Sequence, residues 1–125
     1  MSIELKLSAI YKAAHVDIPA QASLLGKQGT AVSNATSTAC GELSKLGHGL
    51  SNDIFNLGDE IVFRLRQVAG TMNQCSTALD EIADDFAAKD EEASSWMQKH
   101  GRWLDDNGYG GTPDRARLPE QPKEK

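Results

Sequence analysis

Acidic side chains are concentrated in one short stretch of the chain, residues 80–92. They are Asp80, Glu81, Asp84, Asp85, Asp90, Glu91 and Glu92. Two pairs of them lie four residues apart, so on a helix their carboxylates would be neighbours and could hold a divalent cation weakly. A solvated helix face is the commoner reason for such a run. The same charge could also repel an identical neighbour or attract a basic partner.

The remaining reactive side chains lack the spacing of a catalytic or metal site. His15, His48 and His100 lie in three separate regions, and none has a second ligand at metal-binding spacing. Cys40 and Cys75 have no histidine near them in the sequence. We therefore predict a non-enzymatic protein that has no catalytic residue, metal site or cofactor.

The composition narrows the possible partners. A formal net charge of -5 argues against nucleic acid, because a phosphate-binding surface needs a basic patch. No apolar run approaches the roughly 18 residues of a membrane span. The N-terminal residues carry charges among their apolar positions and show no secretory signal. We expect a protein that stays in the cytoplasm or leaves by a route that uses no such signal.

Helical periodicity dominates the middle of the chain. Apolar and small residues recur in steps of three and four from Ile18 to Leu46, and again from Leu57 to Trp96. Asp17 can cap the first helix, and Pro19 suits its first turn. We predict an all-α fold, an antiparallel two-helix hairpin over residues 17–100. Its first helix covers about 18–46, its turn 47–52 and its second helix about 53–98.

The apolar stripe of the second helix predicts a packing seam. Its members are Leu57, Ile61, Leu65, Val68, Met72, Leu79 and Ile82. A single hairpin would leave other apolar residues such as Val62 and Phe63 uncovered. We therefore expect dimerisation into a four-helix bundle, with this stripe as the dimer or partner seam.

The two ends of the chain differ from the hairpin. Residues 1–16 are predicted to be a short N-terminal extension with a helix from Ser8 to His15. Residues 101–125 hold most of the prolines and several glycines, so we predict a flexible polar tail. Phe86 lies farther from the turn than the start of the first helix, so residues 84–96 would overhang it. The segment 3–16, a second subunit or an external partner must then cover this overhang.

Phe86 and Asp90 stand four residues apart, so on a continuous helix they would share one face. Aromatic residues at helical spacing are more often core than signal. However, a partner could take an apolar side chain and a charge together if the overhang stays accessible.

These features together resemble the small helical-hairpin substrates of type VII secretion, the WXG proteins and their relatives. The nearest likeness is to the EspC-like family of excreted virulence factors. It rests on the entry Val16-Asp17-Ile18-Pro19, on His48-Gly49 followed by Phe55 and Asp59, and on Phe86, Asp90, Glu91, Ala93 and Trp96. The resemblance covers about residues 16–97. Two features depart from it: Phe86 stands where the family usually has tyrosine, and Leu46-Gly47-His48-Gly49 replaces the Trp-x-Gly turn.

The resemblance implies a WXG-like hairpin whose secretion signal is Phe86, Asp90 and Trp96, and whose turn is formed by Gly47, His48, Gly49 and Phe55. It implies recognition by a type VII secretion ATPase. The protein would be cytoplasmic before export and then secreted or on the cell surface. A homodimer remains possible, whereas a partner that supplies the missing turn would favour a heterodimer with another helical hairpin.

Two other functions remain open at this point. The chain could be a cytoplasmic adaptor or targeting chaperone that pairs with the helical N-terminal domain of a larger secreted toxin. It could also neutralise a toxin through the acidic end of the second helix.

Overall fold

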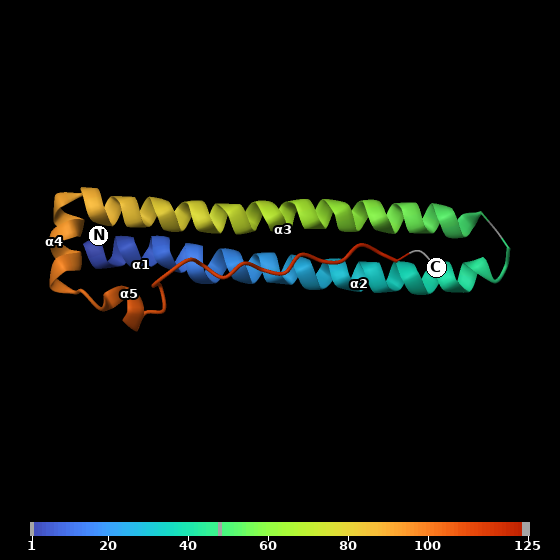
Figure 1. Cartoon of the computed structure of the whole chain (residues 1–125), viewed down its shortest axis with the longest axis horizontal. Coiled ribbons are helices and arrows are strands. Elements are labelled where there is room, and N and C mark those ends of the chain that lie inside the picture. The colour runs from blue at the N-terminus through green and yellow to red at the C-terminus, as the bar shows by residue number, and fades with distance from the viewer. Residues whose placement is uncertain (1, 48, 124–125) are drawn as a thin grey trace. The chain divides into compact units, whose positions relative to one another are not determined.

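In a computed structural model, the described residues, 2–47 and 49–123, form helices and connecting segments without strands. The all-helical class predicted from the sequence is therefore confirmed. Figure 1 shows the elements in chain order. They are α1 (Ile3–Lys12), the π-helical turn η1 (Ala13–Asp17), α2 (Ile18–Ser44), α3 (Leu50–Lys89), α4 (Glu91–Lys99) and α5 (Trp103–Asp106).

The chain divides into two compact units, which we describe separately. The first unit comprises Met1–Gln21 and Met72–Arg115, and the second comprises Ala22–Thr71 and Ala116–Lys125. Helices α2 and α3 each contribute to both units.

The first unit begins with α1, which starts earlier in the chain than the helix predicted from Ser8. The Ser2 hydroxyl accepts a hydrogen bond from the Leu5 amide at 3.2 Å and so caps α1. Ile3, Leu7 and Tyr11 follow at intervals of four residues, which places all three on one buried face. The helix predicted from Ser8 therefore starts at Ile3.

The helical chain then continues through the predicted boundary at Asp17. The Ile18 amide bonds to the Ala13 carbonyl, five residues back, which is the pattern of a π-helical turn. Pro19 comes next and has no amide hydrogen to donate. The wider π-helical turn therefore comes directly before the residue that cannot donate to the helical hydrogen-bond pattern. Asp17 is part of this turn, so the expected cap at Asp17 is wrong.

The long second helix predicted to reach residue 98 is interrupted. α3 ends at Lys89, Asp90 is extended (φ −75°, ψ 124°), and α4 begins at Glu91. Figure 1 shows α4 turning away from the direction of α3.

In the second unit, α2 buries small side chains rather than large ones. The buried residues of α2 are Ala22, Gly26, Gly29, Ser33, Thr36, Cys40 and Gly41. A Cβ atom on Gly58 of α3 would collide with the Thr36 side chain, so this glycine is required by the close approach of the two helices.

The predicted seam of α3 does not mark the buried face. In the second unit, Leu57, Ile61 and Val68 are 60%, 41% and 48% exposed, and Leu65 is half-buried. The residues that follow three of them, Gly58, Val62 and Ala69, are buried instead.

The first unit shows the same shift. Ile82 is 60% exposed beside the buried Ala83, while Met72 and Leu79 are half-buried. Since successive helical residues point about 100° apart, the buried face is turned by one position from the predicted stripe.

The connection between α2 and α3 lies close to its predicted place. α2 ends at Ser44, and Gly47 has a φ of 68°, a left-handed conformation that glycine adopts without strain. Gly49 is exposed, and Phe55 is half-buried within α3, which begins at Leu50. His48, the remaining predicted turn residue, lies outside the described residues.

The segment predicted as a flexible polar tail differs from that expectation. Within the first unit it forms α5, and Pro113 is buried. In the second unit Pro119 and Pro122 are buried, and the Arg66 guanidinium donates a hydrogen bond to the Pro119 carbonyl. Prolines favour extended segments as well as disordered ones, and here they pack against helices.

The sequence predicts no membrane-spanning helix, and the described helices agree with that prediction. None of them combines the length and apolar character that crossing a membrane requires.

Candidate recognition site

Phe86 belongs to the core of the first unit. It is half-buried and packs against a cluster of buried residues. The cluster consists of Ile3, Leu7, Tyr11, Ala83, Ala87 and Ala93. Of the three covers considered for the overhang, the N-terminal segment is therefore the one present in the structure.

Asp90 is the residue that changes the chain direction. Its carboxylate accepts a hydrogen bond from the Ala93 amide at 2.9 Å, and its carbonyl accepts one from the Ser94 amide at 2.8 Å. Its own amide donates to the Phe86 carbonyl at 2.9 Å and so completes the last turn of α3. Aspartate is among the best residues for this N-cap position, because its side chain satisfies an otherwise unpaired amide.

The break at Asp90 contradicts the prediction that Phe86 and Asp90 share one face of a continuous helix. Phe86 and Asp90 do not share a face of one helix, because Asp90 is not helical. They are instead joined through the main chain, with the aromatic side chain at the end of α3 and the carboxylate at the start of α4.

Trp96 lies within α4, six residues after Asp90, and is also half-buried. Its ring stacks on His100, with centroids 4.2 Å apart, and meets the edge of Trp103 at 5.4 Å. The Trp103 ring also makes an edge contact with the Tyr11 ring, and the Tyr109 ring stacks on the Tyr11 ring. The structure thus packs two of the three predicted signal residues, Phe86 and Trp96, against the same buried cluster.

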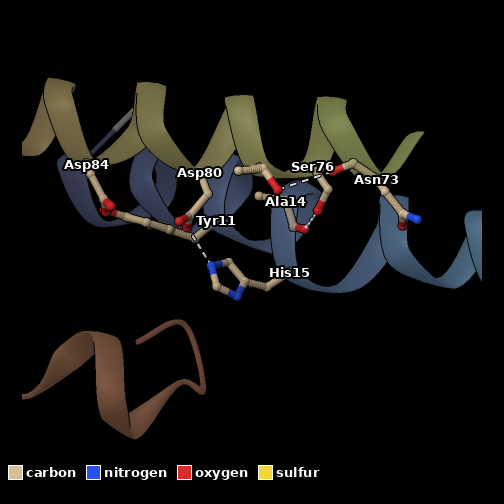
Figure 2. Close-up of polar contacts among 8 residues, drawn as sticks. Tyr11, Ala14, His15, Asn73, Ser76, Asp80 and Asp84 are labelled. Atoms are coloured by element: carbon tan, nitrogen blue, oxygen red, sulfur yellow. Dashed lines mark hydrogen bonds and ion pairs between the residues drawn. The ribbon is translucent and has the colours of Figure 1, made fainter. Parts of the chain in front are cut away.

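Polar side chains in two facing rows connect α3 to the N-terminal helices. Figure 2 shows Asp84, Asp80, Ser76 and Asn73 along α3, opposite Tyr11, Ala14 and His15. The Tyr11 hydroxyl donates to Asp84 Oδ1 at 2.6 Å, and His15 Nε2 lies 2.5 Å from Asp80 Oδ1. The Ser76 hydroxyl donates to the Ala14 carbonyl, which lies in the π-helical turn.

Asp84 is exposed, but the part of this network around His15 and Asp80 is buried, which makes each partner there necessary. The side chains of His15 and Asp80 are 7% and 9% exposed, and a buried carboxylate without a partner is costly. Burial raises the pKa of Tyr11 above its ordinary value, and the hydrogen bond to Asp84 and the charges of Asp84 and Asp80 add to that rise. Tyr11 therefore stays a hydrogen-bond donor well into alkaline pH.

The acidic cluster is divided among separate structural tasks. Asp80 and Asp84 bind the N-terminal helices, Asp90 caps α4, and Asp85 lies 2.8 Å from Lys89, whose pKa it raises by hydrogen bonding and charge. Asp84 and Asp85 are exposed despite these contacts, and Glu81, Glu91 and Glu92 are exposed as well. Among the described residues no group of three or more histidine, cysteine or acidic side chains is arranged to hold a metal ion.

Sequence reasoning missed the role of the N-terminal residues. The sequence analysis assigns Tyr11 and His15 to the N-terminal extension, because Asp17 and Pro19 predict the start of a new helix after them. A signal was present, since Ile3, Leu7, Tyr11 and His15 recur every four residues, as on one helix face. The predicted turn residues Gly47, Gly49 and Phe55 belong to the second unit.

The chain matches no protein-family model, no curated protein and no solved structure.

Proposed function

We propose that this chain is a small, non-enzymatic helical protein that a type VII-like secretion system exports. Phe86 and Asp90 are the residues that the secretion ATPase recognises, and Trp96 holds the start of α4 in place. The proposal rests on the resemblance of residues 16–97 to EspC-like proteins. It makes the protein cytoplasmic before export and secreted or surface-bound afterwards.

The observation that carries the proposal is the helix break at Asp90. The break gathers a half-buried aromatic ring, a capping carboxylate and the exposed acids Glu91 and Glu92 within a few residues. The buried cluster and the aromatic rings fix the position of this segment. A partner would therefore bind an aromatic ring and carboxylates that are already held in place, which lowers the entropy cost of binding.

Pairing with a second helical protein is part of the same proposal. In this proposal α2 and α3 act as the arms of a hairpin in the second unit, and a partner hairpin covers the stripe Leu57, Ile61 and Val68, whose side chains are exposed. Burying one such side chain contributes about 1.5–3 kcal/mol. A partner hairpin on this stripe would form the expected four-helix bundle.

The exposed stripe also favours the second candidate function, an adaptor for a larger secreted toxin. The toxin's helical N-terminal domain would then replace the partner hairpin. A pull-down from the native cell, separated into lysate and medium, distinguishes the two. Recovery in the medium supports export, whereas recovery only in lysate, bound to a large protein, supports the adaptor.

A matched pair of substitutions tests the pairing surface. Leu57→Asp places a charge on the stripe, and Leu5→Asp places one on an equally exposed leucine of α1, since these leucines are 60% and 61% exposed. We expect Leu57→Asp to lose the partner and Leu5→Asp to keep it. Retention of the partner by both variants would show that the stripe is not the interface.

Substitutions at Phe86 test the export signal. Phe86→Tyr restores the aromatic residue that is usual in the family and is expected to be exported at least as well as the unmodified chain. Phe86→Ala is expected to remain in the cell. Circular dichroism at growth temperature must show that the alanine variant is folded. Normal export of a folded Phe86→Ala protein would rule out this part of the proposal.

A further inference from the structure

A polar groove runs along α2 in the second unit and has no role in the proposed export signal. One wall is α2, from Ser23 to Ser37, and the other is the C-terminal strap, defined as residues 116–123. Figure 1 shows this last part of the chain running beside α2. The groove has a volume of about 830 Å³, which is within the range of ligand-binding clefts.

The strap forms a fixed wall because three features hold it. A Cβ atom on Gly26 would lie 2.6 Å from the Arg117 carbonyl oxygen, and one on Gly29 would lie 2.5 Å from Pro119. The two glycines therefore let the strap lie against α2. On its other side, Gln121 Nε2 donates to Asp59 Oδ1 of α3 at 2.6 Å.

The groove is positively charged although the whole protein is acidic. Lys27, Arg117 and Lys123 line it together with a single carboxylate, Glu120, so three positive charges face one negative charge. Arg117 and Glu120 form an exposed ion pair of 3.2 Å, which leaves both lysines to attract a ligand. The protein carries a net charge of -5, so this patch of opposite sign marks a place for an anionic partner.

The other groups of the groove suit a peptide better than a nucleic acid. Side chains that can donate and accept hydrogen bonds line it, and none of the lining residues is aromatic, so no ring is available for base stacking. The polar residues of the α2 wall are Ser23, Thr30, Ser33, Asn34 and Ser37. The strap is itself extended, and an extended peptide beside it can pair with its main chain.

From this geometry we infer that the groove binds an extended, acidic peptide segment of a partner protein. The wall from Ser23 to Ser37 is about 21 Å long, which is the length of roughly six extended residues. Carboxylates of the peptide lie against Lys27 and Lys123, and Arg117 adds positive charge to the groove while it is paired with Glu120. This site uses none of the residues of the proposed export signal.

The test uses the full chain and defined hexapeptide probes. The binding probe is an acetylated, fluorescently labelled hexapeptide of alternating valine and glutamate, and the control probe replaces glutamate with lysine. Binding is followed by fluorescence anisotropy, and amide chemical shifts locate the site. The charge-reversal variants are Lys27→Glu and Arg117→Glu, both at exposed positions. The matched control is Lys99→Glu, an exposed lysine outside the groove.

We expect the acidic probe to bind and the basic probe not to bind. Amide shifts should be confined to residues 23–37 and 117–123. Each groove substitution should weaken binding by about tenfold, and Lys99→Glu should leave it unchanged. Binding should also weaken as salt is added, because exposed charges are screened.

Three outcomes would overturn the inference. They are absence of binding at millimolar probe, equal binding after both charge reversals, and tighter binding of a single-stranded oligonucleotide than of the acidic peptide. The Phe86→Ala variant should bind the acidic probe normally. A failure of the export proposal would therefore leave this result intact, and the reverse also holds.

Discussion

The two units differ in the side chains that fill their cores. The first unit turns large side chains inward, with Leu7 and Tyr11 fully buried beneath an aromatic group from α4 and α5. The second unit buries glycine, serine and alanine along α2 and leaves Leu57, Ile61 and Phe63 exposed. A similar helical pattern in the sequence therefore gives one unit with its own aromatic core and one with an uncovered apolar surface.

This difference suggests a division of roles. The polar network and the aromatic group fix the segment around Phe86 and Asp90, so the first unit presents a preformed surface. In our proposals, the exposed stripe and the groove of the second unit bind other molecules. The predictions below test each side of this comparison, beginning with the largest expected effect.

Removing Asp80 should damage the first unit most. Asp80→Ala leaves His15 buried without its partner, which we expect to lower the free energy of unfolding by about 3–5 kcal/mol. Glu81→Ala, at an exposed neighbouring position, should change it by less than about 0.5 kcal/mol. Urea denaturation measures both. Equal losses for the two variants would mean that the buried pair has no special role.

Two leucines of α1 test whether the N-terminal helix is part of the core. Leu7 is fully buried and Leu5 is 61% exposed. Leu7→Ala should lower the free energy of unfolding by about 2–4 kcal/mol, whereas Leu5→Ala should have little effect. Thermal unfolding by circular dichroism provides the comparison. Similar midpoints for both variants would show that α1 does not cover Phe86 in solution.

Gly29 and Gly70 compare a covered glycine with an open one in the second unit. A side chain at Gly29 would collide with Pro119, while nothing lies within 4 Å of a Cβ atom at Gly70. Gly29→Ala should loosen the strap and speed tryptic cleavage after Arg117 by roughly tenfold. Gly70→Ala should leave cleavage unchanged and stabilise α3 by about 0.5–1 kcal/mol. Unchanged cleavage of Gly29→Ala would show that the strap is not held against α2.

The buried tyrosine makes stability depend on alkaline pH. The pKa of Tyr11 is higher in the folded chain than in the unfolded chain, so above the ordinary tyrosine pKa the unfolded chain loses its proton first. Raising the pH from 9 to 11 should then favour unfolding by about 1 kcal/mol through this residue. Tyr11→Phe, measured by urea denaturation at both pH values, should lose less stability than the unmodified chain. An equal loss would exclude this linkage.

The sequence predicted the class and much of the helical layout, but not which face is buried. Periodicity located helices close to α2 and α3. Ala22, Gly29 and Thr36, which lie seven residues apart within the predicted stripe from Ile18 to Leu46, are buried. On α3 the stripe predicted from large apolar residues is the exposed face. Hydropathy gives little weight to small residues, and small residues fill the close contact between the helices. The buried position of Gly58 follows from its contact with Thr36, which no local pattern reveals.

The candidate site was predicted in its residues but not in its geometry. The choice of Phe86, Asp90 and Trp96 rests on the resemblance to the EspC-like family, and the structure places all three in the first unit. The break at Asp90 was missed because no proline or glycine marks it. Asp90 is a residue that can cap a helix, but whether it does so depends on the packing of Ala93 and Trp96 against the N-terminal helix.

The most direct test of the export account separates the charge of Asp90 from its role as a cap. Asp90→Asn keeps a side chain that caps a helix equally well but removes the charge, whereas Asp90→Ala removes both and should cost about 1 kcal/mol. The measurement is the fraction of each variant found in the medium of the native cell, with folding checked by circular dichroism. We predict that folded Asp90→Asn stays inside the cell. Export of Asp90→Asn at the level of the unmodified chain would contradict the account and leave Asp90 as a helix cap alone.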